Sequence, residues 1–158
     1  DRRQGWAQAM RLHGFSECQD NLLVLPCSDY ELLLEENVDG QARCYQAIVD
    51  LLSCQIKKTC VFAVNDMIAQ LVYKAAAQCG LRVGKDVFVV GFDDHPLCNR
   101  LEPPLSSVHQ SIEKLGYEAA KLLYEDISGN VTRPIHKVIP VYLKVRESSS
   151  GVLSLKAI

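Results

Sequence analysis

Apolar and polar positions along the chain form two main patterns: a helical period in some segments, and continuous apolar runs typical of buried strands in others. The run Val87–Val90 is continuously apolar, which predicts a strand buried on both faces of a parallel sheet covered by helices. We expect this strand to stop at Gly91, and two carboxylates, Asp93 and Asp94, follow it. Ligands of open α/β sheets lie just outside the carboxyl ends of the strands, so both Asp residues suit a binding role, although an Asp there often only forms a turn.

The rest of the pattern predicts helices and strands in alternation. Helical periodicity covers four segments, at residues 3–13, 41–55, 66–80 and 111–128. Extended segments are predicted at residues 22–25, 60–64, 106–109 and 135–145, and capping-box spacing predicts a short helix from Ser28. The strand–helix–strand succession through residues 60–90 is a βαβ unit, so we expect an α/β fold, a parallel-sheet lobe flanked by helices. The Ser-rich residues 147–158 are predicted to be a loose tail.

Two polar residues, Asn65 and Asp66, follow the strand predicted at residues 60–64. Asp66 suits the N-cap of the next helix, because its side chain can accept an orphan backbone N–H. If the two buried strands are neighbours, Asn65 and Asp93 converge at one edge of the sheet. An amide beside a carboxylate can recognise vicinal hydroxyls or amines. The alternative is that Asn65 only ends its strand.

Composition restricts the possible functions further. The 158 residues suit one medium-sized domain, and a net charge of −2 with no basic run gives no electrostatic footprint for nucleic acid. No apolar stretch is long enough to span a bilayer, and no signal-peptide pattern opens the chain. The seven cysteines are odd in number and lack C-x-x-C spacing, which argues against a zinc site and a disulfide framework. We therefore expect no membrane, metal or cofactor, and a reducing, cytoplasmic compartment.

Enzyme motifs for nucleophilic, phosphate-binding, dinucleotide-binding or zinc-dependent chemistry do not occur in the sequence. His95 and Cys98 share one loop, which leaves a Cys–His hydrolase as a remote alternative. Nothing in the sequence marks Cys98 as an activated thiol, and His95 is more simply a loop residue. We expect no enzymatic activity.

A series of short motifs resembles one known family over residues 1–148. The motifs occur in the family's order: Arg2-Arg3-Gln4-Gly5-Trp6, Val61-Phe62-Ala63-Val64-Asn65-Asp66, Gly80-Leu81-Arg82-Val83-Gly84, Val89-Val90-Gly91-Phe92-Asp93-Asp94, Pro103-Pro104-Leu105-Ser106-Ser107-Val108-His109-Gln110 and Val145-Arg146-Glu147-Ser148. Together they resemble the LacI/GalR family of bacterial transcription regulators. The resemblance implies a periplasmic-binding-protein-like type I domain, in which two α/β lobes close over a small molecule.

The resemblance also implies a ligand-binding set in this chain. By motif position, Arg2 matches the family's effector-gripping arginine, Asn65 and Asp93 match polar groups at strand ends, and Gln110 matches the glutamine at the hinge between lobes. These four residues are the predicted pocket, and the effector is predicted to be a sugar or a related metabolite.

The chain corresponds to about the second half of such a regulator, without the helix-turn-helix and the N-terminal lobe. We interpret residues 1–148 as a partial effector domain, comprising the C-terminal lobe, the hinge and a helix (111–128) that in the family packs on the missing lobe, and residues 149–158 as a tail. The predicted function is effector sensing and homodimerisation, with DNA bound only through the absent region. Interface candidates are Leu71, Leu97 and Leu101, and the alternative for Leu71 is a position in the core. The alternative is a periplasmic sugar-binding transport protein.

Overall fold

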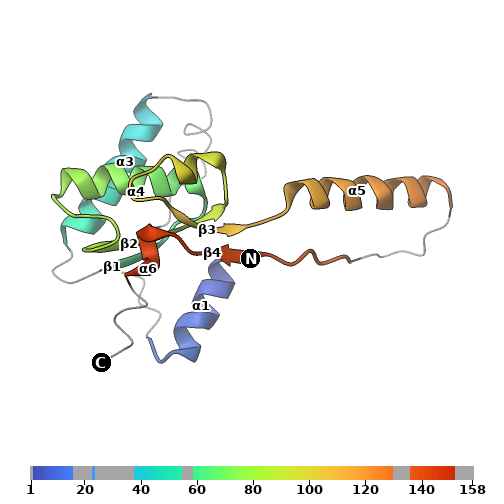
Figure 1. Cartoon of the computed structure of the whole chain (residues 1–158), viewed down its shortest axis with the longest axis horizontal. Helices are drawn as coiled ribbons and strands as arrows, with labels where there is room; N and C mark the ends of the chain where they lie inside the picture. The colour runs from blue at the N-terminus through green and yellow to red at the C-terminus, as the bar shows by residue number, and fades with distance from the viewer. Residues whose placement is uncertain (1, 16–22, 24–37, 55–58, 130–135, 152–158) are drawn as a thin grey trace.

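The computed structural model describes residues 2–15, 23, 38–54, 59–129 and 136–151, and contains a four-stranded sheet with helices on both sides (Figure 1). The strand order is β1 (Thr59–Phe62), β2 (Val87–Asp93), β3 (Ser106–His109) and β4 (Tyr142–Lys144). β1, β2 and β3 are parallel, and β4 is antiparallel to β3. The predicted α/β lobe is confirmed; the strand predicted at residues 22–25 and the helix predicted from Ser28 lie outside the described residues.

The hydrophobic core lies between the sheet and two helices, α3 (Val38–Ser53) and α4 (Asp66–Gln78). Both helices cover the same face of the sheet, and α4 is the crossover between the parallel strands β1 and β2 (Figure 1). Their apolar residues at helical spacing supply most of the core: Cys44, Ile48, Val49, Leu52, Ile68, Ala69, Leu71, Val72, Ala75 and Ala76. Val87 and Val89 of β2 are buried on this face and Phe88 on the opposite face, as the continuous apolar run predicts, whereas Val90 is half-buried.

β2 is longer than its sequence suggests. The prediction that it stops at Gly91 is wrong, because Gly91, Phe92 and Asp93 pair with Ser107, Val108 and His109 of β3. Gly91 is instead the place where a buried side chain of α4 comes against the strand. A Cβ at this position would lie 2.2 Å from Oδ1 of Asp66. Close approach of a neighbour, and not a turn, is therefore the reason for glycine here.

The C-terminal part of the described chain differs from its prediction in two ways. Within the described residues 136–145 of the alternating segment, a strand forms only over β4, because β3 offers a short edge for pairing. The beginning of the predicted loose tail is a short helix, α6 (Glu147–Ser150), against the sheet. Ser148 is fully buried there, donating to the carbonyl of Val89 and accepting from the N–H of Ser106.

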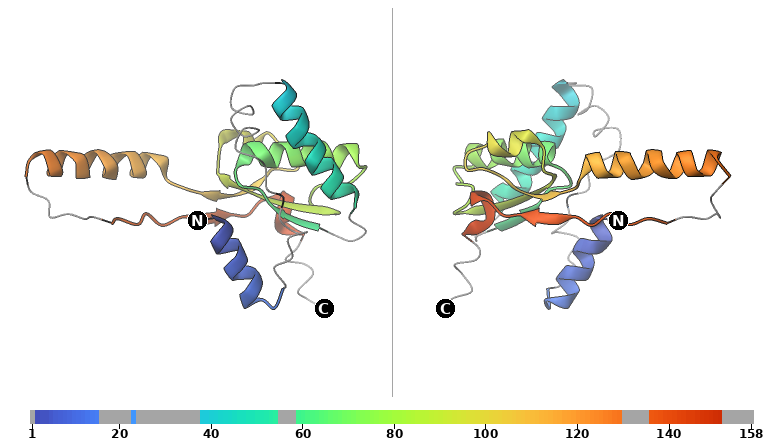
Figure 2. Two further views of the ribbon diagram at one scale, coloured as in Figure 1. Left: turned by 180° about the vertical axis from the view of Figure 1, so that it is seen from behind. Right: turned by 45° about the vertical axis from the view of Figure 1, so that its right-hand side comes forward.

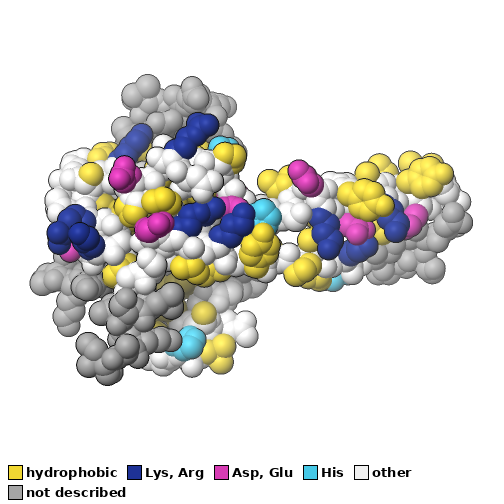
Figure 3. Space-filling model, in the orientation of Figure 1, with side chains coloured by type: hydrophobic (Ala, Val, Ile, Leu, Met, Phe, Trp, Pro, Cys, Tyr) yellow, Lys and Arg dark blue, Asp and Glu magenta, His cyan; other side chains and the backbone are white. Residues whose placement is uncertain are grey.

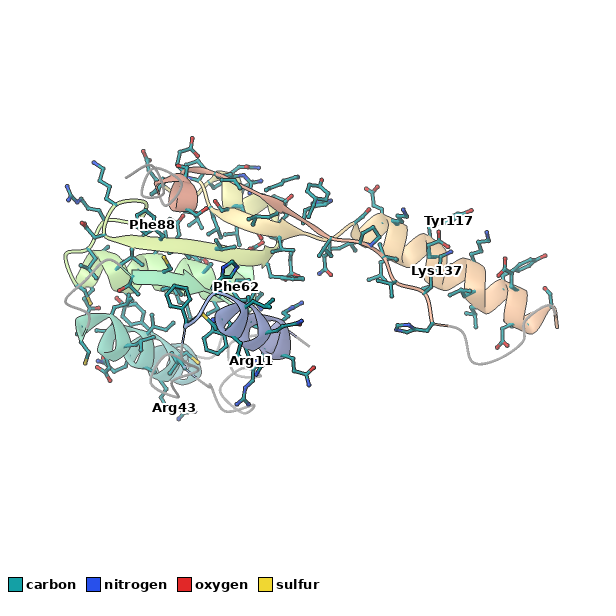
Figure 4. All side chains as sticks on the ribbon, turned by 90° about the horizontal axis from the view of Figure 1, so that it is seen from below. Arg11, Arg43, Phe62, Phe88, Tyr117 and Lys137 are labelled. Atoms are coloured by element: carbon teal, nitrogen blue, oxygen red, sulfur yellow. The ribbon has the colours of Figure 1, made fainter. Side chains whose placement is uncertain are left out.

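In the part of the chain that the structure describes, two helices have no buried residue, α1 (Arg2–Leu12) and α5 (Ile112–Ile127). α1 lies on the side of the sheet opposite α3 and α4 (Figure 2). α5 and the extended residues 136–141 project from the body as an arm, whose surface carries many apolar side chains (Figures 1 and 3). Tyr117 and Lys137 both lie on this arm (Figure 4). Among the described helices, none is long and apolar enough to cross a membrane.

Candidate functional site

The candidate site lies where β2 ends, at a turn with unusual backbone geometry. Asp93 has φ 107° and Asp94 has φ 56°, so two consecutive residues other than glycine have positive φ. Such conformations cost on the order of 1–3 kcal/mol each and persist only where the surrounding structure holds them. The turn aims the two carboxylates at different neighbours.

Asp93 lies between an amide and a cation. Its Oδ1 accepts a hydrogen bond from Nε2 of Gln110 at 2.6 Å and forms an ion pair with Nη2 of Arg2 at 3.8 Å. The Arg2 guanidinium also donates to the carbonyl of Val64 at 2.8 Å and lies 4.0 Å from the centre of the Phe92 ring. Three residues distant in sequence, Arg2, Asp93 and Gln110, therefore meet at one sheet edge.

The ionisation of Asp93 reflects this position. Burial raises the pKa of the Asp93 carboxyl above its ordinary value, and the charge of Asp66 acts in the same direction. Arg2 and Gln110 oppose this rise in the pKa, since both favour the ionised form. One-third of the Asp93 side chain is exposed, at 33%, so it can reach a solute.

Asn65 takes the capping role that the sequence suggests for Asp66. It is the N-cap of α4, with its Oδ1 accepting from the N–H of Ile68 at 2.9 Å. The prediction that Asp66 is the cap is therefore wrong, because Asn65 has the extended backbone that a cap needs, with φ −154°. Asn65 remains at the carboxyl end of β1, beside the end of β2, with a largely buried side chain.

Asp66 instead makes a buried carboxylate behind the turn. Its Oδ1 accepts from Oγ of Ser107 and its Oδ2 from the N–H of His95, both at 2.7 Å. The side chain is placed by Gly91, which leaves room for it on β2. Asp66 thus joins the beginning of α4 to the middle of β3 and to the chain after Asp94.

Asp94 faces away from Asp93 and is held by basic groups. It accepts from Lys144 at 2.5 Å, from Arg146 at 2.7 Å and from His109 at 2.8 Å. Burial opposes its ionisation, but these hydrogen bonds together lower the pKa of Asp94 to about 2. Sequence reasoning missed this cluster. The signal that could have revealed the cluster is the i, i+2 spacing of Lys144 and Arg146, which puts both side chains on one face of an extended segment.

The loop after the turn carries His95 and Cys98 in structural roles. Nδ1 of His95 accepts from the N–H of Leu97 at 3.2 Å and caps a short 3-10 helix, η2 (Pro96–Asn99). Cys98 is fully buried, and burial together with Asp66 raises the pKa of its thiol to about 12. A thiol held in its protonated form is a poor nucleophile, so the geometry does not support the Cys–His alternative. Within the described ranges, no group of three His, Cys, Asp or Glu residues could hold a metal ion.

The predicted interface residues separate into two groups. Leu71 is buried in the core of this chain, so the alternative of a core position is confirmed and the interface candidate is rejected. Its position on the inner face of α4 explains the burial. Leu97 and Leu101 are half-buried in the loop after Asp94, and Leu101 packs on the core.

The sequence matches known proteins along most of its length. Residues 1–149 match the periplasmic binding protein-like domain family. The HTH-type transcriptional regulator CelR of Thermobifida fusca is 41% identical over 88 residues, which is 56% of this chain and 26% of that protein. The HTH-type transcriptional repressor PurR of Histophilus somni is 32% identical over 143 residues, 88% of this chain and 41% of that protein. The chain therefore spans less than half the length of these relatives.

Solved structures agree with the sequence matches. A transcriptional regulator CelR–cellobiose complex superposes with a TM-score of 0.76 and 30% identity, covering 94% of this chain and 42% of that one. A LacI family regulator from Enterococcus faecium with bound ribose gives a TM-score of 0.61 and 29% identity, over 70% and 41% of the two chains. A lac repressor dimer bound to operator gives 0.62 and 29%, over 67% and 37%.

Proposed function

This chain belongs to the family of periplasmic binding protein-like domains that LacI-type transcriptional regulators contain, and on that premise we propose that it senses a sugar-like effector for such a regulator. The observation that carries the proposal is the meeting of Arg2, Asp93 and Gln110 at the carboxyl edge of the sheet. Relatives solved with cellobiose and with ribose support a carbohydrate effector.

The chemistry of the cluster suits a polyhydroxylated ligand. The ionised Asp93 accepts hydrogen bonds from two hydroxyls, the Arg2 fork donates to hydroxyl or ring oxygens, and the Gln110 amide does both. Asn65 at the neighbouring strand end completes the proposed set. The Gln110–Asp93 hydrogen bond of 2.6 Å orients the carboxylate before a ligand arrives.

The proposal extends to the organisation of the protein. Residues 1–148 form one lobe of a two-lobed effector domain with its hinge, and residues 149–158 are its tail. The apolar face of α5 packs on a companion lobe; its exposed large side chains are Ile112, Leu115, Tyr117, Leu123, Tyr124 and Ile127. The mass of the endogenous protein decides where that lobe comes from. A mass above the 17.6 kDa of this chain places both lobes in one polypeptide, and a mass equal to it requires a second polypeptide.

The same proposal includes homodimerisation, with Leu97 and Leu101 as contacts, DNA binding through a separate helix-turn-helix region, and a cytoplasmic location. The dimeric lac repressor on its operator supports the dimer. A periplasmic transport protein is the less favoured function, because the relatives are named as transcriptional regulators.

Calorimetric titration of the intact gene product with cellobiose and with ribose tests the function. We expect one sugar to bind, and Asp93→Asn to weaken binding by at least about tenfold, since a charged acceptor is worth roughly 1.5–3 kcal/mol. Gln110→Ala is expected to weaken it less. The control is Glu113→Gln on the exposed face of α5, which should leave affinity unchanged. Equal affinity in the wild type and in Asp93→Asn excludes the proposed site.

A further inference from the structure

The basic cluster around Asp94 joins three separate segments of the chain. His109 is the last residue of β3, Lys144 the last residue of β4, and Arg146 lies just before α6. All three donate to one carboxylate whose side chain is only 6% exposed. Arg146 also donates to the carbonyl of Leu105 at 2.7 Å, so replacing it would change a second contact. Lys144 Nζ donates to Asp94. Lys144 is therefore the cleaner probe of this cluster.

Two of these segments are the two connections of the projecting arm to the body. The chain leaves the sheet at His109, passes through Gln110 into α5, and returns through residues 136–141 to Lys144 (Figure 2). The rings of His109 and Tyr142 lie 4.8 Å apart, so the outgoing and returning connections also contact each other. The carboxylate of Asp94 consequently contacts the arm's base on both sides.

Asp93 directly precedes Asp94 in the chain. The two residues share the strained turn, with φ values of 107° and 56°. Ser107 accepts from the N–H of Asp94 at 3.1 Å, and Asp66 accepts from the N–H of His95 at 2.7 Å. These bonds hold the turn's backbone from behind. The side chain of Asp94 ties the same turn to the base of the arm. A shift of either connection of the arm is therefore expected to move Asp93.

We propose that Asp94 is a positioning residue that fixes Asp93 in its ligand-binding orientation and couples occupancy of the site to the position of the α5 arm. The inference rests on the proposed function for the ligand, but the coupling itself rests on the cluster. Coupling between two sites is reciprocal: a ligand that fixes Asp93 stabilises the Asp94 cluster, and displacement of the arm weakens ligand binding. Site occupancy would thereby be transmitted to whatever the arm packs against.

Substitutions in the intact gene product test the proposal with cellobiose and ribose as probes. Asp94→Asn retains the shape and tolerates positive φ, and it is expected to weaken binding about tenfold, within the range of coupling energies that distant positions exert. Asp94→Gly relieves the strain but removes the anchor, and is expected to weaken binding as much. Lys144→Met, which does not touch Asp93, is expected to weaken binding several-fold, and Lys144→Arg to restore part of it.

Two comparisons separate positioning from a general loss of structure. The double variant Asp94→Asn with Lys144→Met should bind like Asp94→Asn alone, because Lys144 acts through Asp94. The matched control is Lys137→Met, which removes the Lys137–Glu118 ion pair within the arm without touching the turn, and should leave affinity unchanged. Additive losses in the double variant, or an equal loss in Lys137→Met, would overturn the proposal.

A readout without ligand keeps the two proposals separable. The side-chain amide of Gln110 donates to Asp93, so its ¹H–¹⁵N signal reports the orientation of Asp93 directly. We expect Asp94→Asn and Lys144→Met to shift this signal toward that of a solvated amide, and Lys137→Met to leave it in place. A shift in a protein that binds neither sugar would retain the positioning role and reject the sugar effector. An unmoved signal in Asp94→Asn would reject the positioning role whether or not a sugar binds.

Discussion

The hydroxyl of Ser107 lies 2.7 Å from Oδ1 of Asp66, and this hydrogen bond joins the middle of β3 to the first residue of α4 beneath the candidate site. The hydroxyl oxygen of Ser107 also accepts a hydrogen bond from the N–H of Asp94 at 3.1 Å. One buried hydroxyl therefore serves the carboxylate behind the turn and the backbone of the turn itself. Ser107 and Asp66 are almost completely buried, so water cannot easily replace the hydrogen bond between them or the one from Asp94.

Ser107→Ala is expected to destabilise the fold by about 1–3 kcal/mol, the usual cost of leaving buried polar groups without partners. The variant leaves one oxygen of Asp66 and the N–H of Asp94 unsatisfied. Urea unfolding followed by circular dichroism measures the change as a lower midpoint at an unchanged slope. The control is Ser150→Ala at the exposed end of α6, expected within about 0.5 kcal/mol of the wild type. Equal midpoints for both variants would contradict the role of Ser107.

Gly91→Ala tests the close approach of Asp66 to β2. The added Cβ would lie 2.2 Å from Oδ1 of Asp66 and 3.2 Å from Cδ2 of Leu105, so buried groups must move. Overpacking of this kind costs about 1–3 kcal/mol or more. The matched control is Gly116→Ala in α5, where a Cβ meets nothing within 4 Å and the better helix former is expected to stabilise by up to about 1 kcal/mol. Opposite shifts of the thermal midpoint are the expected result, and a Gly91→Ala protein as stable as the wild type would contradict it.

The sequence predicts the sheet and its site edge well because those features depend on local pattern. The apolar run of β2 and the helical periodicity of α4 are strong signals, and both elements occur, although β2 extends to Asp93 and Asn65 is the cap of α4. The meeting of Arg2, Asp93 and Gln110 is also observed, although their role as ligands stays a prediction. Their convergence was implied by family resemblance, since no local pattern relates residues so far apart.

The parts that sequence reasoning missed depend on tertiary partners. Asn65 and Asp66 are both good N-cap residues, and the choice between them is made by Ser107 and His95, which take the Asp66 carboxylate. Ser-rich composition around Ser148 predicts a loose tail, yet its hydroxyl bonds buried backbone groups of two strands. Such pairings depend on where strands end, which composition does not encode.

Acid unfolding should report the Asp94 cluster. The pKa of the Asp94 carboxyl is lowered to about 2 in the folded protein, against about 3.9 in an unfolded chain. Between these values the unfolded state binds more protons, so the stabilisation that ionised Asp94 gives is complete above about pH 4 and is lost as the pH falls toward about 2. Asp94→Asn lacks this contribution. Thermal melts from pH 7 to 2 should show the wild type losing its advantage over Asp94→Asn in this range, and a constant difference at all pH values would contradict the assignment.

Asp93 should give the opposite sign in stability and a distinct effect on binding. Burial raises the pKa of the Asp93 carboxyl in the folded protein. At pH values just above the ordinary pKa of Asp, the folded state therefore binds more protons than the unfolded state. Protonation of Asp93 consequently favours folding as the pH falls. Protonation removes the charged acceptor for ligand hydroxyls. Sugar affinity is therefore expected to fall with decreasing pH, with a midpoint above 3.8, while Asp94 is still ionised.

Titrations with the binding sugar between pH 7 and 4 measure this loss, with circular dichroism at each pH to monitor the fold. Because protonation of Asp93 does not destabilise the folded chain, affinity should decline before any change in the spectrum. Asp93→Asn has no proton to gain there and should bind weakly with little pH dependence, whereas Gln110→Ala removes an interaction that lowers the pKa of Asp93 and should move the midpoint to higher pH. A midpoint that stays fixed in Gln110→Ala would show that another group controls the pH dependence.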